Sequence, residues 1–439
     1  MRKPDVFYGW IVVAVSFVTL SLAFVIWNAF SVFLVAICAE FGWSRADVSL
    51  VFAAFTTIYG LSSPLAGAAM DRFGPRVVMP IGAALLSAGL LGASRATEMW
   101  HLFLAYGLLA AIGVSSIGTS VNSAVLANWF SRRRGAAIGL ASSGIGVGTA
   151  LLVPASQYII QVAGWRAAYV FLAVLVLVIV PPLTFAFQRH RPEDMGLQPD
   201  GGASGQRGGK PAPQLRVVDQ AWAGTVWTVR RAVGTRRFWW LFLGLMFGTL
   251  CHQSVMVHQV AYLGDLGFNP MLAASAVGLV GLFGSIGKLG WGWVSDRIGR
   301  EPSYALGVAC IIAGVVILGL IGGVARMTLL YLYVIAFGIG YGVYTPLSSA
   351  TAADLFQGKR FGAIYGLLWV GSGTGSSLGP WISGLFYDLS GSYLPSLVMS
   401  VAAGFLSVAC FWLSSPGSVR QVPGVAARAL QAAAGRSPG

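Results

Sequence analysis

Residues 67–76 read GAAMDRFGPR, and residues 292–300 repeat the pattern as GWVSDRIGR. Each stretch ends an apolar run with an Asp-Arg pair framed by glycines. Such an aspartate can accept hydrogen bonds from a neighbouring helix start, and the arginines can pair with carboxylates or anionic lipid headgroups. Because these contacts can form in one conformation and break in another, we predict a cytoplasmic gate motif. Its residues are Gly67, Asp71, Arg72, Gly74 and Arg76, then Gly292, Asp296, Arg297, Gly299 and Arg300.

The sequence around these motifs is unusually apolar. Of its 439 residues, 56% are hydrophobic and 10% are charged, whereas a soluble domain carries about 25% charged residues. Breaking the chain where Gly, Pro and charges cluster predicts twelve helices long enough to cross a bilayer. They cover 9–38, 45–70, 77–95, 99–128, 135–163, 165–187, 238–264, 270–294, 303–323, 327–351, 361–386 and 392–415.

The basic residues are distributed unevenly over the predicted loops. With the N-terminus inside, only Arg45, Arg95, Arg166 and Arg326 fall outside, and Lys288 falls within a helix; the other Lys and Arg residues lie on the inner side. Cytoplasmic loops of membrane proteins carry such an excess. It accounts for the formal charge of +14 without nucleic acid. We expect an integral, multi-pass protein of a bacterial inner membrane with both termini cytoplasmic.

The two halves of the chain are related by a repeat. YGWIVVAVSFVTL from Tyr8 aligns with FWWLFLGLMFGTL from Phe238, and the Asp-Arg motif recurs 225 residues later. We predict an N-terminal six-helix bundle over 1–187, a cytoplasmic linker over 188–237, a C-terminal bundle over 238–415 and a cytoplasmic tail over 416–439. In membrane proteins built from two such halves, a small-molecule site lies between them near the midplane.

With the motif doubled, the chain resembles the major facilitator superfamily, whose loop between helices two and three has the form G-x-x-x-D-R-x-G-R. The resemblance implies an all-α membrane protein with twelve transmembrane helices in two pseudo-symmetric bundles. Three stretches further resemble the monocarboxylate porter and oxalate/formate antiporter group: FYGWIVVAVSF, NWFSRRRGAAIGLASSGIGVG and GWRAAYVFLAVL, which begin at Phe7, Asn128 and Gly164.

Lys288 is the single full charge predicted inside the hydrocarbon. It lies eight residues before Asp296, about 12 Å along the helix, and no Asp or Glu is predicted to join it there. An intramembrane cation normally faces a cavity and a partner, so a substrate carboxylate is the simplest partner. The alternative is that Lys288 snorkels to the cytoplasmic interface. The resemblance implies a substrate-binding cation on helix eight, usually arginine; an aspartate that often lies one turn away is Gly284 here.

His252 and His258 on helix seven are the remaining candidate titratable groups at membrane depth and, with Lys288, the candidates for proton coupling. They lie about 120° apart around the helix, so both cannot face one cavity centre. By depth, His252 is nearer Lys288; the resemblance implies a helix-seven histidine at the site and favours His258. Other candidate substrate-binding residues are polar side chains at similar depth, each equally typical of interhelical contacts: Asn28, Tyr59, Asn122, Tyr341 and Tyr344.

These features predict a secondary active transporter of a small organic monoanion, coupled to protons and working by alternating access. One cation favours one negative charge; an oxalate/formate-type exchanger, an exporter of another small compound and a membrane substrate sensor remain alternatives. No paired carboxylates, metal-spaced ligands or ATP-binding loop occur in the sequence, so we expect no enzyme, no metal and no cofactor. The expected partners are a small carboxylate, protons and the lipid bilayer, with no obligate protein partner.

Overall fold

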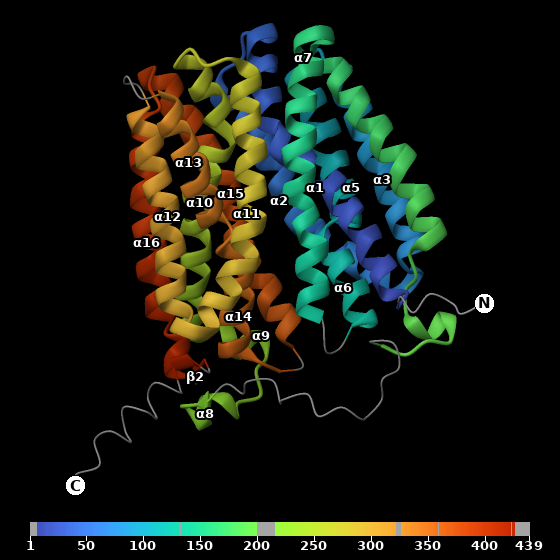
Figure 1. Ribbon diagram of the computed structural model, residues 1–439, viewed down its shortest axis with the longest axis vertical. Coiled ribbons are helices and arrows are strands. Elements are labelled where there is room, and N and C mark those ends of the chain that lie inside the picture. Colours follow the sequence, from blue (N-terminus) through green and yellow to red (C-terminus); the bar gives the residue numbers. More distant parts are fainter. Residues whose placement is uncertain are drawn as a thin grey trace. The chain divides into compact units, whose positions relative to one another are not determined.

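The computed structural model describes residues 7–130, 134–199, 216–321, 326–358, 360–422 and 424–425 (Figure 1). Almost all of these residues are helical, as expected for an all-α membrane protein. The helices before the predicted linker are α1 (Gly9–Phe41), α2 (Arg45–Phe73), α3 (Pro75–Ala93), α4 (Met99–Leu102), the π-helix η1 (Phe103–Ala110), α5 (Ala111–Ile117), α6 (Thr119–Trp129) and α7 (Arg134–Phe187).

The remaining elements follow the same pattern. They are the short 3-10 helix η2 (Pro192–Met195), β1 (Arg216–Val217), α8 (Gln220–Ala223), α9 (Val229–Val233), α10 (Arg236–Asp265), α11 (Pro270–Ile298), α12 (Arg300–Leu320), α13 (Arg326–Tyr341), α14 (Tyr344–Phe356), α15 (Phe361–Ser390), α16 (Leu394–Ser414), η4 (Pro416–Ser418) and β2 (Arg420–Gln421). Residues 200–215 of the predicted linker and residues 423 and 426–439 of the predicted tail lie outside the described ranges.

Ten helical stretches in the described residues are long and apolar enough to cross a membrane. One of them, 136–187, is broken at Gly164, whose φ of 82° and ψ of 163° are not helical. Glycine adopts this conformation without a steric penalty, so the chain turns there and α7 supplies two crossings. With the 30-residue α15 added, the arrangement is consistent with the twelve crossings expected from the sequence.

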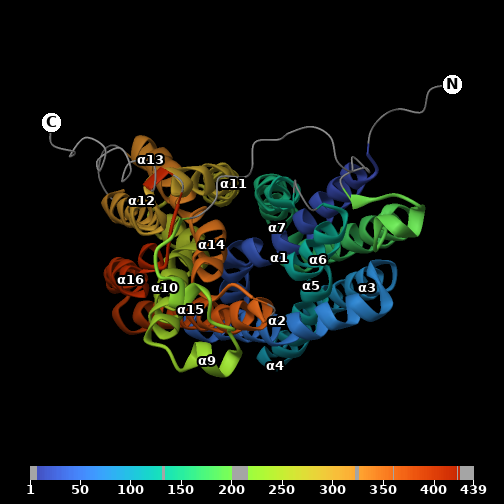
Figure 2. The same cartoon turned by 90° about the horizontal axis from the view of Figure 1, so that it is seen from below.

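By its internal contacts the chain separates into two compact units. Unit 1 consists of 1–206, 256–282 and 380–393, and unit 2 consists of 207–255, 283–379 and 394–439. Two segments of the second half therefore belong with the first. Within unit 1, α1 lies along α7, and α3 contacts α5 and α7 (Figure 2). Whether the functional bundles divide at 187 and 238 stays a prediction.

Glycines allow the backbones of paired helices to meet in both units. In unit 1, a Cβ at Gly144 of α7 would lie 2.3 Å from the Phe17 carbonyl of α1, and one at Gly148 would lie 2.6 Å from the Ser21 carbonyl. In unit 2, Gly371 of α15 meets the Phe242 carbonyl of α10 in the same way, at 2.7 Å. These contacts agree with the repeat, because the fifth and eleventh predicted helices meet the first and seventh.

Candidate functional site

Two interrupted helices mark corresponding places in the repeat. The stretch 99–129 is interrupted at Gly118, between α5 and α6, and the stretch 326–356 is interrupted at Gly342 and Val343, between α13 and α14. At the repeat offset of 225, Gly118 corresponds to Val343. Interrupted helices in corresponding positions of two halves indicate where a transporter binds its substrate. The helical pattern alone did not predict either interruption.

Lys288 lies beside the interruption in unit 2. Its Nζ is 5.3 Å from the centroid of the Tyr341 ring, which is a cation–π contact. The side chain is half-buried. Among the ion pairs that the described residues form, none involves Lys288. The Lys288 ammonium therefore contacts an aromatic face and forms no ion pair with a described carboxylate, so a bound anion could neutralise its charge.

Glycines bring α11 and α13 together at this point. A Cβ at Gly342 would lie 2.5 Å from both the carbonyl carbon of Gly287 and the backbone nitrogen of Lys288. A Cβ at Gly284 would lie 2.6 Å from Cδ1 of Tyr341. These distances leave no room for larger side chains. They give a packing reason for glycine at 284, where the resemblance to monocarboxylate porters implies an aspartate.

His252 of α10 completes this group. Its ring centroid lies 4.9 Å from that of Tyr341 and 5.2 Å from that of Tyr344. Both His252 and Tyr344 are 6% exposed. Neither Nδ1 of His252 nor the hydroxyl of Tyr344 has a hydrogen-bond partner in the part of the chain that the structure describes. Since most buried polar groups are paired, two such groups beside an unpaired cation indicate a place for a polar ligand. We call Lys288, His252, Tyr341 and Tyr344 the Lys288 cluster.

Three other predicted site residues lie in unit 1 and already have partners. Asn28 donates from Nδ2 to Oγ1 of Thr149, 2.8 Å away. Tyr59 shares a 3.1 Å hydrogen bond with Thr119, the first residue of α6. Asn122 donates to the carbonyls of Ile117 and Gly118 at 2.8 and 3.0 Å. Asn122 and Tyr59 thus stabilise the interrupted helix around Gly118, although Oδ1 of Asn122 remains without a described partner.

His258, the other histidine of α10, contacts unit 1 residues rather than joining the Lys288 cluster. Its Nδ1 is 3.0 Å from the Tyr393 hydroxyl, and its Nε2 is 2.8 Å from the carbonyl oxygen of Pro380 and 3.2 Å from Oγ of Ser49. Sequence reasoning slightly favoured His258 over His252 for the substrate site. The geometry favours His252, because its ring lies against both tyrosines of the Lys288 cluster.

An ion-pair group near His258 was not predicted. Arg45, at the start of α2, donates NH1 to Asp265 at 2.7 Å and NH2 to the same carboxylate at 2.9 Å. NH1 also donates to the Tyr393 hydroxyl at 2.7 Å, and the guanidinium carbon lies 3.8 Å from the Tyr387 ring centroid. A sequence signal was present: Arg45 is one of four predicted outer cations, and Asp265 directly follows the predicted seventh helix.

The first copy of the gate motif forms the turn between α2 and α3. Gly74, with φ of 74°, ends α2 and precedes α3. Arg76 donates Nε to the Gln188 carbonyl at 3.1 Å. Asp71 and Arg72 are exposed, and the guanidinium carbon of Arg72 lies 5.1 Å from the Phe73 ring centroid. A Cβ at Gly67 would meet nothing within 4 Å.

The second copy of the motif holds a buried charge. Arg300, 8% exposed, donates to Asp296 at 2.8 Å and to Asp354 of α14 at 3.0 Å. Asp354 is 2% exposed and was not predicted. Gly299 precedes α12 with φ of 112°. The guanidinium carbon of Arg297 lies 3.5 Å from the Trp293 ring centroid, and a Cβ at Gly292 would have open space around it.

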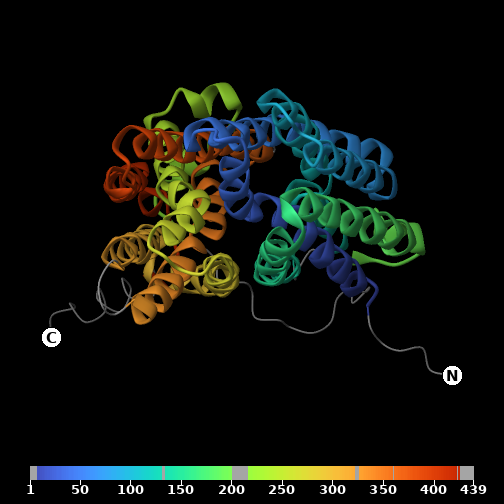
Figure 3. The same ribbon diagram turned by 90° about the horizontal axis from the view of Figure 1, so that it is seen from above.

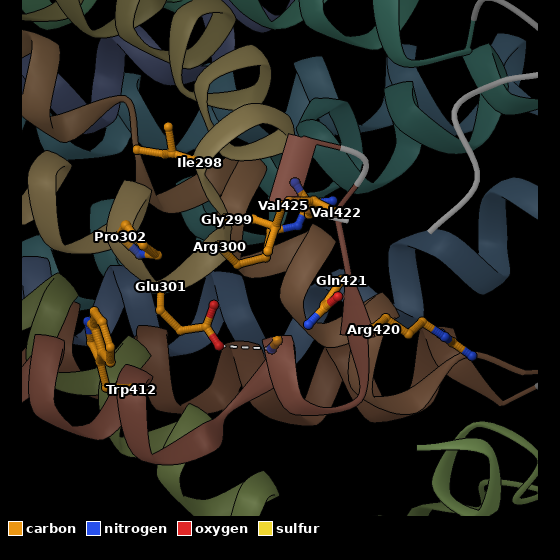
Figure 4. Close-up of a pocket in the computed structure, with 11 residues that line it drawn as sticks. Ile298, Gly299, Arg300, Glu301, Pro302, Trp412, Arg420, Gln421, Val422 and Val425 are labelled. Carbon is orange, nitrogen blue, oxygen red and sulfur yellow. Dashed lines mark hydrogen bonds between the residues drawn. The ribbon is translucent and has the colours of Figure 1, made fainter. Parts of the chain in front are cut away.

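The start of α12 also binds the segment after α16. Glu301 accepts a 2.8 Å hydrogen bond from the backbone N–H of Gly417 (Figure 4). β1 and β2 pair antiparallel, with Arg216 opposite Gln421. A cavity of about 220 Å³ lies here, lined by residues 298–302, Trp412, Gly417, residues 420–422 and Val425. No residue of the Lys288 cluster lines this cavity.

Known proteins match most of the chain. The model of the Major Facilitator Superfamily matches residues 15–344 and 324–436. Monocarboxylate transporter 13 of Rattus norvegicus is 28% identical over 92% of this chain and 88% of its own length. The MFS-type transporter YcxA of Bacillus subtilis (strain 168) is 25% identical over 87% and 88% of the respective chains.

A solved structure shares the fold. It is a bacterial homolog of the human lysosomal transporter Spinster in an inward-facing, occupied conformation, with a TM-score of 0.64, 18% sequence identity, and coverage of 100% of this chain and 98% of that one. The family match, the transporter relatives and the apolar helices make this a multi-pass membrane transporter and not an enzyme. The chain belongs to the major facilitator superfamily.

Proposed function

We propose that this chain is a secondary active transporter of a small monocarboxylate, such as a 2-hydroxy or 2-oxo acid, coupled to protons. The observation that carries the proposal is the Lys288 cluster, in which a cation without an ion pair lies beside two buried polar groups without partners among the described residues. Its place at an interrupted helix supports the proposal. The monocarboxylate transporters among the relatives support the substrate class.

The chemistry of the cluster fits one negative charge. Nζ of Lys288 can form a charge-assisted hydrogen bond with a carboxylate. The Tyr344 hydroxyl can donate to the second carboxylate oxygen or to a 2-oxo group, and Nδ1 of His252 can accept from a 2-hydroxyl or donate when it carries a proton. Tyr341 supplies an apolar face for a short carbon chain.

Proton coupling follows from the same group of residues. Binding an anion beside Lys288 favours a second positive charge nearby, and a histidine can take up that proton near neutral pH. His252 is the coupling candidate at the substrate. Proton and anion would then cross together, and uptake would follow an inward proton gradient. We propose that the chain lies in a bacterial inner membrane with both termini in the cytoplasm, in line with the distribution of basic residues.

The test is uptake of labelled mono- and dicarboxylates into proteoliposomes, with and without an acidic exterior. We expect one or more monocarboxylates to accumulate faster with the gradient. Lys288→Ala is expected to lower uptake by more than about tenfold, since losing one partner of a desolvated charge pair costs about 2 kcal/mol or more. Lys288→Arg keeps the charge and should retain part of the uptake.

Leu289→Ala is the matched control, because Leu289 is the next residue of α11 and is 60% exposed. Its uptake should equal that of the native protein. Full uptake by Lys288→Ala would contradict the role of this cation. Transport seen solely as exchange with preloaded dicarboxylate would instead favour the oxalate/formate-type exchanger.

A further inference from the structure

His258 belongs to a hydrogen-bonded group at one end of unit 1, where α1 is followed by α2. The group joins the start of α2 to the ends of α10 and α15 and to Tyr393. Figure 3 views the protein from this end. We call it the Arg45 cluster, and its members are Arg45, Ser49, His258, Asp265, Asp388 and Tyr393. The asymmetry of basic residues predicts that this end faces outward.

The carboxylates of the cluster are already engaged. Asp265 accepts both guanidinium hydrogen bonds of Arg45. Asp388 accepts from the backbone N–H groups of Arg45 and Ala46, at 3.1 and 2.8 Å. These are the first N–H groups of α2, which have no partner inside the helix. The cluster therefore fixes the start of α2 to α10 and α15.

The direction of the hydrogen bonds through His258 can be assigned from the partners. The Pro380 carbonyl can accept but not donate, so Nε2 of His258 carries a hydrogen. Nδ1 of the neutral ring must then accept the single hydrogen of the Tyr393 hydroxyl. The oxygen of that hydroxyl in turn accepts from Arg45. The ordinary pKa of a tyrosine phenol is about 10, so the hydroxyl keeps its proton at neutral pH.

A proton on Nδ1 reverses this order. Nδ1 would become a donor, and both His258 and Arg45 would then donate to one phenol oxygen, whose own hydrogen would lose its acceptor. A second positive charge would also be placed near Arg45. The charged groups that act on the ring are Arg45 of α2 and Asp388 of α15, and the titratable neighbours are Tyr393 and, on α10, Tyr262 and Asp265.

We propose that His258 is a proton-operated latch: protonation from the outer side loosens the Arg45 cluster and frees the start of α2 from α10 and α15. The inference rests on the proposed proton-coupled transport and adds a second proton site to it, separate in role from substrate binding. An acidic exterior would then favour release of this end of the protein, so that the anion enters together with the proton.

The test uses labelling of Cys38 and needs no substrate. Cys38 of α1 lies next to the cluster, with Sγ 3.9 Å from the Ser44 carbonyl. In a chain whose other cysteines (Cys251, Cys310 and Cys410) are changed to alanine, an impermeant maleimide is applied from outside. We compare His258→Gln with the His258 parent at each pH, because the thiol chemistry itself depends on pH. From about pH 7.5 to about pH 4.5, the labelling ratio of parent to variant should rise at least about threefold.

Two further variants separate the latch from folding and from substrate binding. Tyr393→Phe removes the hydroxyl between His258 and Arg45, so its labelling should be fast at both pH values. His252→Gln changes the other histidine of α10 and should keep the pH-dependent labelling of the parent. Uptake by His258→Gln should continue but lose most of its acceleration by an acidic exterior.

An unchanged ratio of parent to His258→Gln across this pH range would overturn the inference, even where uptake is proton-coupled. A ratio that rises with acidity supports the latch even where the transported anion is not a monocarboxylate. Failure of the latch and failure of the proposed substrate are therefore distinguished by separate measurements.

Discussion

Tyr304 and Tyr344 are two buried tyrosines with opposite surroundings. The Tyr304 hydroxyl is 2.7 Å from Oγ of Ser407, and its ring stacks on Phe411 with centroids 3.8 Å apart. The Tyr344 hydroxyl has no described partner, although its ring lies only 6.0 Å from that of Tyr304. A buried hydroxyl without a partner costs free energy of folding. We interpret this cost as the result of a binding role.

The prediction for these residues is a pair of substitutions. Tyr344→Phe should leave thermal stability in detergent equal or higher, because the unpaired hydroxyl is removed. It should raise the KM for the transported anion by about tenfold or more, because one hydrogen bond to a charged group is lost. Tyr304→Phe should behave in the opposite way, lowering stability by about 1 kcal/mol and leaving KM unchanged. A stability loss in Tyr344→Phe without a KM change would contradict this.

The sequence identified Lys288, Tyr341 and Tyr344 as site candidates because polar residues are conspicuous in apolar helices. By resemblance it slightly favoured His258 over His252, whereas the geometry favours His252, because the rotation of α10 is set by its neighbours and is not known from the sequence. Asp354 was missed for a similar reason. Its burial depends on Arg300, 54 residues earlier, and no local pattern links them.

Among the elements, α11 and α13 show how packing positions a charge. Their backbones meet where Gly287 of α11 lies against Gly342, the residue directly after α13, beside Lys288. The predicted runs located these helices well because a long apolar stretch is a strong signal. The interruptions at Gly118 and Gly342 were not predicted, since each lies against another helix: Gly118 against the Tyr59 side chain, and Gly342 against the backbone of Gly287 and Lys288.

We predict that Gly342→Ala displaces α13 from α11 and moves Tyr341 away from Lys288. Since the added methyl would lie 2.5 Å from the backbone of Gly287 and Lys288, the helices must shift. Overpacking of this kind costs about 1 to 3 kcal/mol, and uptake should fall about tenfold. Gly290→Ala is the control, because its Cβ would meet nothing within 4 Å. Equal uptake by both variants would show that the close approach does not position the site.

At the scale of the whole molecule, segments distant in sequence are tied together at the predicted cytoplasmic side of unit 2. β1, from the predicted linker, pairs with β2, from the predicted tail. Trp222 of α8 donates to the Leu355 carbonyl of α14, and Gly417 donates to Glu301. The sequence predicted a cytoplasmic linker, from its Gly, Pro and Arg content, and a cytoplasmic tail. Composition does not reveal pairing between two short strands more than 200 residues apart.

We predict that deleting residues 416–439 lowers the unfolding temperature in detergent by a few degrees. The deletion removes the β1–β2 pairing and the bond to Glu301, and each such hydrogen bond contributes about 0.5 to 1.5 kcal/mol. A chain that ends at residue 425 retains both and is the matched control. If the two truncated chains unfold at the same temperature, these contacts do not stabilise unit 2.

Unit 1 is discontinuous in sequence, which has a consequence for biosynthesis. Arg45 is made early, but its partner Asp265 follows 220 residues later and Asp388 follows 343 residues later. Domains generally fold from the N-terminus while the chain is still being made. Here the start of α2 remains without its Asp388 cap until nearly the whole chain has been synthesised. Unit 1 therefore cannot be completed while only its N-terminal helices have been made. A fragment that stops after the first six helices would lack the residues that cap the start of its own α2.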